Sequence, residues 1–158
     1  QLSDARLIDD IDAILKETGM DSEHLQLEVT ESAAMENPER TFGILDALRQ
    51  RGLHVYIDDF GTGYSNLGQL KRMPIDALKI DKSFVNDVLT DSDDAEIVNA
   101  TIRLAHALKL RVVAEGVETF EQVAFLKQNG CDEIQGYVVS KPLTPSKVGE
   151  LFALNYTF

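Results

Sequence analysis

Five short apolar segments alternate with helical segments along this chain, and each apolar segment ends in a polar residue. We expect strands at 25–30, 54–58, 77–81, 111–115 and 133–139. Strands separated by helices predict βαβ crossovers and a parallel sheet, in an α/β fold. Because side chains in a strand alternate between the two faces, each strand has one apolar face that helices can cover. The opposite face of each strand ends in a polar side chain: Glu28, Asp58, Lys79, Glu115 or Gln135.

The segments between the strands carry helix signals. Asn37 and Pro38 supply a cap and a first-turn residue, and Gly52 ends the same helix. Thr119 and Gln122 have the spacing of a capping box. We therefore expect helices at about 4–18, from 38 to 51, at 93–109, from 119 to 129 and from about 144 onward, with a short helical turn at 66–72.

The polar strand ends also bear on the architecture. Open α/β sheets and (β/α)₈ barrels both place their sites at the carboxyl ends of the strands. An open sheet concentrates its site at one switch point, whereas a barrel gathers side chains from many strands around one centre. Five polar ends in succession therefore favour a barrel. Five strands cannot close a barrel of eight, and the sequence starts directly on a helix, so we expect the first part of the domain to lie outside this chain.

Composition limits the class of protein. With 158 residues and 44% hydrophobic content, the chain fits one domain with a buried core. The single cysteine, Cys131, rules out an internal disulfide and agrees with a reducing, cytoplasmic setting. No apolar run approaches the length of about 18 residues that a membrane span needs. The formal charge of −12 argues against a nucleic-acid polymer as partner, because Lys and Arg hold such polymers.

The strongest chemical signal is a pair of adjacent acids at a strand end. Asp58 and Asp59 follow an apolar strand and precede a loop with glycines at 61 and 63. Two unit charges about 4 Å apart repel by roughly 4 kcal/mol at an effective dielectric constant near 20. Hard cations such as Mg²⁺ favour such carboxylate sites and bridge them to phosphate. The pair predicts metal-assisted phosphate chemistry, with a plain turn into the loop as the alternative.

The other polar positions each allow a structural interpretation. Lys79 lies between two apolar residues, and a buried ammonium needs carboxylates or phosphate beside it. A structural ion pair with Asp81 or Asp58 explains it equally well. Glu28 and Glu31 are also compatible with a solvated strand end. In the same way, Glu118 suits the start of a helix, and Gln135 is compatible with a buried amide.

Five motifs follow one another along the chain: Leu27-Glu28-Val29-Thr30-Glu31-Ser32, Asp58-Asp59-Phe60-Gly61-Thr62-Gly63-Tyr64-Ser65, Leu78-Lys79-Ile80-Asp81, Val113-Ala114-Glu115-Gly116-Val117-Glu118-Thr119 and Gln135-Gly136-Tyr137. In this order they resemble the EAL domain family, the cyclic di-GMP phosphodiesterases of bacterial signalling. The resemblance runs over essentially the whole chain. The family's naming Glu-Ala-Leu motif and its Asn-x-Ser strand are absent, and each supplies a metal ligand in the family.

The resemblance implies a fold and a set of roles. It implies a TIM-like (β/α)₈ barrel with one irregular strand, of which residues 1–158 would be the C-terminal part of one EAL domain, about the last five βα units. Four acids would belong to a two-metal site for Mg²⁺ or Mn²⁺, with Lys79 on the attacking water or the phosphate. The metal-site acids implied are Glu28, Asp58, Asp59 and Glu115. The implied catalytic set consists of Lys79, Glu115, Asp58 and Gln135. The resemblance also implies that the loop after Asp59 is braced by Glu31 and Glu118, which would couple metal binding to dimer contacts.

The expected activity is hydrolysis of cyclic di-GMP to linear pGpG by the intact parent, with this chain alone a poor catalyst. Two alternatives stay open: an EAL-like receptor that binds cyclic di-GMP without cutting it, and a phosphoacceptor receiver domain, which also uses an acidic pair and a lysine. Uncovered strand edges predict a homodimer or a strand-swapped assembly. The family implies attached sensory or GGDEF domains and a cytoplasmic location, including the cytoplasmic part of a membrane-anchored protein.

Overall fold

One parallel sheet organises the chain. The computed structural model describes residues 2, 4, 6–63 and 66–152, apart from the side chains of 151 and 152. The five strands are hydrogen-bonded in the order β1-β2-β3-β4-β5, and every neighbouring pair is parallel. The predicted α/β fold with a parallel sheet is confirmed. The strands are β1 (Gln26–Thr30), β2 (His54–Phe60), β3 (Ala77–Ile80), β4 (Arg111–Glu115) and β5 (Glu133–Gln135).

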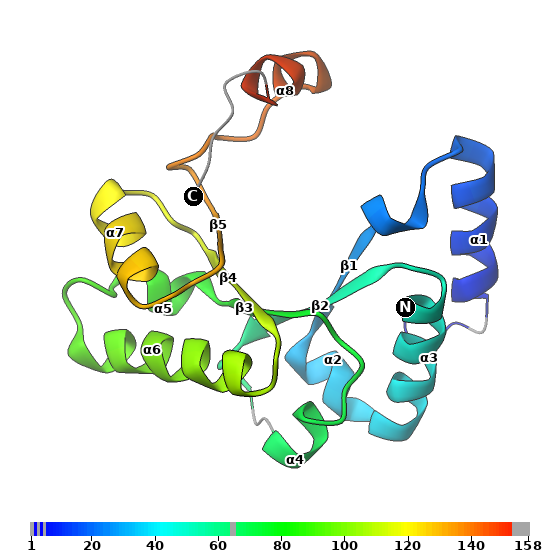
Figure 1. Cartoon of the computed structure of the whole chain (residues 1–158), viewed down its shortest axis with the longest axis horizontal. Coiled ribbons are helices and arrows are strands. Elements are labelled where there is room, and N and C mark those ends of the chain that lie inside the picture. The colour runs from blue at the N-terminus through cyan, green and yellow to red at the C-terminus, as the bar shows by residue number, and fades with distance from the viewer. Residues whose placement is uncertain (1, 3, 5, 64–65, 153–158) are drawn as a thin grey trace.

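Helices cover one side of this sheet. Figure 1 shows α2 to α7 around the outside of the arc of strands, with no helix across its inner side in the ranges described. The longest, α6, has 16 residues, and no described helix combines the length and apolar content needed to cross a membrane. The helices are α1 (Leu7–Thr18), the 3₁₀ turn η1 (Ser22–His24), α2 (Glu31–Glu36), α3 (Pro38–Gln50), α4 (Leu67–Leu70), α5 (Lys82–Asn86), α6 (Ser92–Ala107), α7 (Phe120–Gln128) and α8 (Pro145–Phe152).

The strand order identifies the architecture. A receiver domain uses the doubly wound order 2-1-3-4-5, with helices on both faces. Here spatial order equals sequence order, and each crossover returns on the same side, as in the wall of a (β/α)₈ barrel. The receiver alternative is therefore excluded. The chain forms five consecutive βα units of a TIM-like barrel, as predicted.

Alternation along the strands separates two environments. Val55, Ile57, Leu78 and Ile80 are at most 1% exposed and belong to the main core between the sheet and the helices. Full burial of each such side chain contributes about 1.5–3 kcal/mol. On the opposite face, Tyr56, Ala77 and Val113 form a separate, small apolar cluster. The predicted period of two is confirmed, and it leaves the carboxyl end of the inner face to polar residues.

Two predicted helix starts have the expected hydrogen bonds. The side chain of Asn37 caps α3 by accepting from the amide of Arg40, with Pro38 in the first turn. Thr119 and Gln122 make both hydrogen bonds of the capping box at the start of α7. Local side-chain chemistry therefore sets where these helices begin.

Two short helices were not predicted, α2 and α5. Each begins directly at a strand end, where a side chain caps it: Thr30 accepts from the amide of Ala33, and Asp81 accepts from the amide of Ser83. Helices of five or six residues are too short to show a helical period in the sequence. Their effect is to draw the chain sharply away from the strand end, which leaves that edge of the sheet to side chains.

The last strand is shorter than predicted. The segment 133–139 was expected to be one strand, but β5 ends at Gln135. A Cβ at Gly136 would overlap the backbone of Val117, so the chain turns against the loop that follows β4. Val117 then donates to the carbonyl of Gln135 at 3.1 Å and accepts from the amide of Val138 at 3.0 Å. The loop after β4 is thereby held by the strand next to it.

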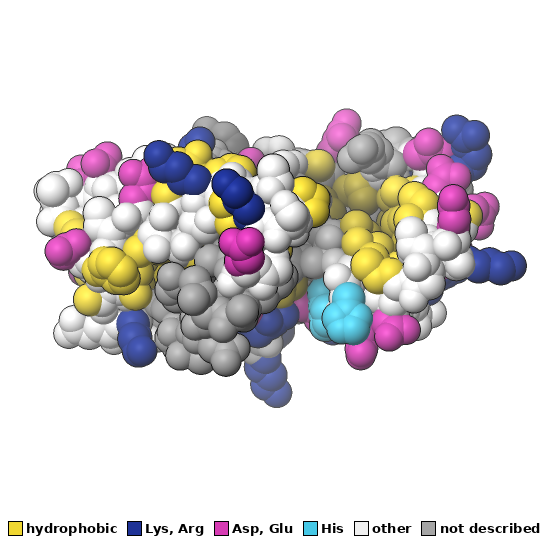
Figure 2. Space-filling view, turned by 90° about the horizontal axis from the view of Figure 1, so that it is seen from above, with side chains coloured by type: hydrophobic (Ala, Val, Ile, Leu, Met, Phe, Trp, Pro, Cys, Tyr) yellow, Lys and Arg dark blue, Asp and Glu magenta, His cyan; other side chains and the backbone are white. Residues whose placement is uncertain are grey.

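Surface charge is distributed without a basic concentration on the face in Figure 2. There the Lys and Arg side chains are scattered among Asp and Glu side chains. The formal net charge is −12. The prediction that no nucleic-acid polymer is a partner stays a prediction.

The thiol of Cys131 is buried against the backbone at the edge of the sheet. It is 6% exposed, and its thiol lies 3.2 Å from the carbonyl oxygen of Glu133 and 3.6 Å from that of Val112. Burial raises the pKa of this thiol from 9.0 to about 11. The folded state therefore favours the neutral thiol, which is the unreactive form.

We expect thiol reagents to label Cys131 slowly at pH 8 in the folded protein and rapidly in urea. The unfolded state loses its thiol proton at lower pH than the folded state, so the free energy of unfolding should fall between about pH 9 and pH 11. The upper limit is about 2 to 3 kcal/mol. Urea titrations across this range measure the loss, and in Cys131→Ala this part of the decline should vanish. Fast labelling of folded protein would contradict the buried position.

Candidate metal centre

The centre of the site is the ammonium group of Lys79 on β3. Its Nζ lies 2.7 Å from Oε2 of Glu28, 3.0 Å from Oδ1 of Asp58 and 2.5 Å from Oε1 of Glu115. These acids come from β1, β2 and β4, so four adjacent strands meet at one point. The Lys79 side chain is 2% exposed, whereas the three carboxylates are 39%, 23% and 17% exposed. The charged cluster is therefore buried on the lysine side and accessible on the carboxylate side.

The cluster fixes the charge of Lys79. Burial acts to lower the pKa of the ammonium, but the hydrogen bonds to Glu115 and Glu28 and the ionic contact with Asp58 outweigh burial and raise the pKa above its ordinary value. Burial raises the pKa of Glu115, the hydrogen bond and charge of Lys79 lower it, and the charges of Asp58 and Glu28 raise it; the net shift is upward. Lys79 thus stays protonated at physiological pH, while the acids around it still compete for positive charge.

A break in strand register brings Asp59 to the same place. Ile57 pairs with Leu78 and Phe60 pairs with Ile80, so β2 has two residues where β3 has only Lys79. This is a β-bulge, and Asp59 takes a positive φ of 54° within it. In a regular strand, Asp58 and Asp59 would point to opposite faces. Here one carboxylate oxygen each from Asp58, Asp59 and Glu115 lie within 4.8 Å of one another.

Asp59 is destabilised as an anion in this position. Burial and the nearby charges of Asp58 and Asp81 raise its pKa, and Lys79 only partly offsets them. Asp81 was considered as an ion-pair partner of Lys79, but it caps α5 instead, with Ser83 as its partner. A cation beside Asp59 would relieve the repulsion that the protein itself leaves uncompensated.

Glu31 connects α2 to the loop after Asp59. Its side chain is 2% exposed, and Oε2 accepts a hydrogen bond of 3.0 Å from the amide of Gly61. A Cβ at Gly63 would lie 3.0 Å from Oε1 of the same carboxylate, so a glycine there allows the loop to approach closely. The structure thus places Glu31 on the loop that it was predicted to brace. Tyr64 and Ser65 of the matching motif lie outside the described residues.

Glu118 and Gln135 lie at the rim of the site. Glu118 has an exposed side chain, and its backbone amide donates to Oε1 of Gln122. Gln135 is exposed and stands beside Glu115 in the ladder between β4 and β5. Neither side chain makes a hydrogen bond to the acidic cluster among the residues described. Their predicted roles in bracing and supporting the site therefore remain predictions.

The donor set fits a divalent cation. Oδ1 of Asp58 is buried and accepts no well-directed hydrogen bond, although it is within ionic contact of Lys79. Carboxylate oxygens from Asp58, Asp59 and Glu115 converge, with Glu28 on the other side of the ammonium. Hard cations such as Mg²⁺ and Mn²⁺ take such all-oxygen ligand sets.

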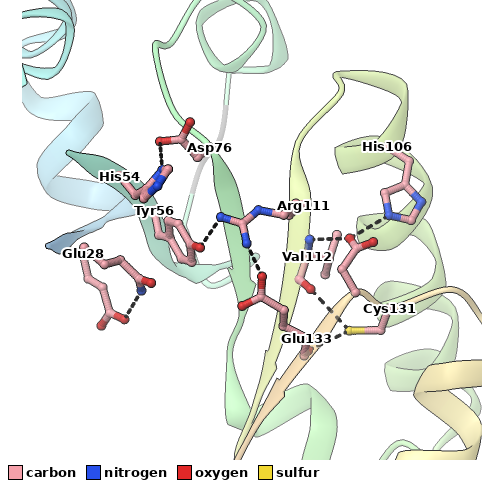
Figure 3. Close-up of polar contacts among 11 residues, drawn as sticks. Glu28, His54, Tyr56, Asp76, His106, Arg111, Val112, Cys131 and Glu133 are labelled. Atoms are coloured by element: carbon pink, nitrogen blue, oxygen red, sulfur yellow. Dashed lines mark hydrogen bonds and ion pairs between the residues drawn. The ribbon is translucent and has the colours of Figure 1, made fainter. Parts of the chain in front are cut away.

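A second cluster of polar side chains, Arg111, Glu133 and Tyr56, lies on the inner face toward the amino ends of the strands. Arg111 donates to Glu133 and to the hydroxyl of Tyr56, and its guanidinium lies 5.3 Å from the centre of the Tyr56 ring (Figure 3). The apolar cluster that contains Tyr56 separates this group from the acidic cluster. The positive charge of Arg111 is thus used at the amino ends of the strands, which leaves Lys79 as the cation of the acidic cluster among the described residues.

Removal of the ammonium should expose the repulsion among the acids. In Lys79→Met, three carboxylates lose their common partner, so we expect the free energy of unfolding at pH 7 to fall by about 2–4 kcal/mol. Millimolar Mn²⁺ or Mg²⁺ should restore part of it. Acidification should also help, because the pKa of Glu115 is already raised in the folded state and would lose the opposing effect of Lys79, so that folding takes up a proton. Urea titrations with and without metal measure this effect.

The matched control is Lys71→Met, because Lys71 is exposed. Its stability should change by no more than about 0.5 kcal/mol and should not respond to metal. A Lys79→Met protein as stable as its parent at pH 7 without metal would contradict the arrangement of charges.

Comparisons with known proteins identify the family of this chain. A model of the EAL domain matches residues 1–142. Cyclic di-GMP phosphodiesterase NbdA of Pseudomonas aeruginosa is 47% identical over 157 residues, 99% of this chain and 20% of the relative. Cyclic di-GMP phosphodiesterase PdeR of Escherichia coli is 41% identical over 143 residues, 90% of this chain and 22% of the relative. The chain thus spans about a fifth of the length of these relatives.

Solved structures share the fold. The PaMucR phosphodiesterase in complex with c-di-GMP superposes with a TM-score of 0.90 at 44% identity, over 93% of this chain and 60% of that one. Klebsiella pneumoniae BlrP1 in a manganese and cyclic di-GMP complex gives a TM-score of 0.80 at 33% identity, over 89% of this chain and 36% of that one. On the family match and these likenesses together, the chain belongs to the EAL domain family.

Proposed function

We propose that this chain supplies the metal-binding acids and the lysine of a phosphodiesterase that hydrolyses cyclic di-GMP to linear pGpG. The observation that carries the proposal is the convergence of Glu28, Asp58 and Glu115 on Lys79, with Asp59 turned into the same place by the bulge. Relatives named cyclic di-GMP phosphodiesterases and a c-di-GMP complex of a structural neighbour support the substrate.

Four acids would hold the metal: Glu28, Asp58, Asp59 and Glu115. Mg²⁺ or Mn²⁺ in a two-metal site is our proposal, supported by the all-oxygen donor set and by the manganese complex of BlrP1. When bound, such ions polarise the phosphodiester and lower the pKa of a coordinated water. The protein supplies the preorganisation, because these acids are fixed on β1, β2 and β4, around Lys79 on β3, before substrate arrives.

Lys79 would act on the reacting phosphate. Its ammonium is charged at physiological pH and held by three carboxylates. Metal binding by those carboxylates would release an N–H of Lys79, which could then donate to a phosphate oxygen or to the attacking water. It then offsets the charge that develops at phosphorus in the transition state.

The loop after Asp59 would couple the site to its surroundings. Glu31 holds this loop through the amide of Gly61, and we propose that Glu118 braces it from the other side. Gln135 would support the site from β5, beside Glu115. Through this loop, metal binding would be linked to the contacts of a homodimer.

The rest of the protein is also a matter of proposal. Because this chain spans about a fifth of the curated relatives, we propose that further barrel strands, in a longer parent or in a strand-swapped partner, complete the ligand set. β1 is an outer strand of the sheet that the described residues form, a position suited to such pairing. We also propose that sensory or GGDEF domains are attached to this part of the protein and that this part lies in the cytoplasm.

The test is production of pGpG from cyclic di-GMP in the presence of Mn²⁺ by the parent, the full-length protein that carries this chain, with this chain alone assayed beside it. We expect turnover by the parent, little by this chain alone, and loss on chelation by EDTA. Asp58→Asn and Glu115→Gln should each reduce turnover by roughly a hundredfold or more. The control is Glu96→Gln, because Glu96 is an exposed acid on α6.

The rival function is a receptor that binds cyclic di-GMP without hydrolysis. Binding by the parent with no pGpG in saturating Mn²⁺ would establish the receptor and overturn the proposal. Full turnover by Asp58→Asn would contradict the assignment of the site.

A further inference from the structure

The amide side chain of Gln122, in the first turn of α7, is buried and fully hydrogen-bonded. It is 6% exposed. Its Oε1 accepts from the backbone amides of Glu118 at 2.8 Å and Thr119 at 3.0 Å. Its Nε2 donates to the carbonyl oxygens of Val85 at 3.1 Å and Asn86 at 3.4 Å. These four bonds use both lone pairs of the oxygen and both hydrogens of the nitrogen.

The partners of this amide follow two strands that carry site residues. Val85 and Asn86 end α5, the helix that begins directly after β3, the strand of Lys79. Glu118 and its neighbour end the loop that begins directly after β4, the strand of Glu115. The side chain of Gln122 thus connects α5, which follows the strand of Lys79, to the loop that follows the strand of Glu115. Lys79 and Glu115 make the shortest of the three contacts in the cluster.

A close backbone approach makes the same connection at the other end of α5. Gly116, directly after Glu115, has a φ of 69°, and a Cβ there would lie 2.5 Å from the Cβ of Lys82. The loop after β4 is therefore packed onto the first residue of α5 and tied through Gln122 to its last turn. Two contacts, one at each end of α5, thus hold the loop on the side of β3, while the hydrogen bonds of Val117 to Gln135 and Val138 hold it on the side of β5.

The hydrogen bonds that Nε2 of Gln122 donates to α5 are not needed to cap α7. A capping box needs only an acceptor at the third position, which is why Glu serves there as well as Gln. Glutamate has no hydrogens to donate to Val85 and Asn86. Replacement of the Gln122 amide by a carboxylate would therefore remove the hydrogen bonds to α5 and keep the acceptor that caps α7.

We infer that Gln122 is a positioning residue for the Lys79–Glu115 pair, and that its amide sets the separation of the segments behind β3 and β4. The inference rests on the proposed function, which it deepens. Gln122 acts through the loop and touches no substrate. Its loss should therefore displace the carboxylate of Glu115 from the ammonium and from the other acids without unfolding the domain.

The test is Gln122→Glu in the full-length protein that carries this chain, at a temperature well below its unfolding transition. We expect kcat for cyclic di-GMP hydrolysis to fall by roughly tenfold or more, with KM changed by less than about twofold. The Mn²⁺ concentration that half-saturates the protein, measured by electron paramagnetic resonance without substrate, should rise several-fold. The binding measurement needs no activity.

Two control variants separate positioning from stability. Gln128→Glu makes the same chemical change at an exposed position of α7 and should leave kcat and Mn²⁺ affinity unchanged. Thr119→Val removes the hydroxyl that accepts from the amide of Gln122 and weakens the helix cap, but it leaves the bridge to α5 intact. It should lower the free energy of unfolding by about 1 kcal/mol, with little effect on Mn²⁺ affinity.

Wild-type kcat and Mn²⁺ affinity in folded Gln122→Glu would overturn the inference. Equal loss in Thr119→Val would overturn it too, because the effect would then belong to the helix cap. If Gln122→Glu fails to fold, Gln122→Met tests the bridge without a buried charge, and failure of both assigns Gln122 to folding alone. A parent that makes no pGpG defeats the proposed function instead, while Mn²⁺ affinity still decides the role of Gln122.

Discussion

The ion cluster around Lys79 is the interaction on which the site depends. A buried ammonium is stable only with its partners in place, and here the partners come from three neighbouring strands. That requirement is met only if the strands lie side by side in sequence order and in register. The apolar residues on the outer face determine the sheet, and the sheet then determines the distances within the cluster. Stability and the chemistry of the site are therefore carried by opposite faces of the same strands.

The bulge in β2 decides which acids belong to the site. With regular alternation, Asp59 would face the helices, where an uncompensated carboxylate is costly. One extra residue opposite Lys79 turns Asp59 toward Asp58 and Glu115 instead. Both aspartates then serve one cluster, at the cost of a positive φ and of a raised pKa for Asp59. Glu31 secures this strained segment by accepting from the amide of Gly61.

Sequence reasoning reached the parts of this structure that depend on local pattern. The period of two gave the strands and the shared face of Glu28, Asp58, Lys79 and Glu115, because alternation is a property of each strand alone. The bulge, the early end of β5 and the helices α2 and α5 could not be predicted in this way. The bulge and the early end of β5 depend on contacts between distant segments, such as Gly136 against Val117, whereas α2 and α5 are too short to show a helical period. Gln122 shows the same division: its cap was predicted from spacing, but its bonds to α5 appear only in three dimensions.

Charge explains why four acids and one lysine are found together. Glu28, Asp58, Asp59 and Glu115 carry four negative charges when ionised, and Lys79 supplies one positive charge, which leaves a net charge of −3. Two divalent cations with one phosphodiester bring +3, which offsets the charge of the residues that this chain supplies. Without Lys79 the balance of this part of the site would change to −1, and without Asp59 it would change to +1. The charges of Lys79 and Asp59 therefore offset each other within the part of the site that this chain supplies.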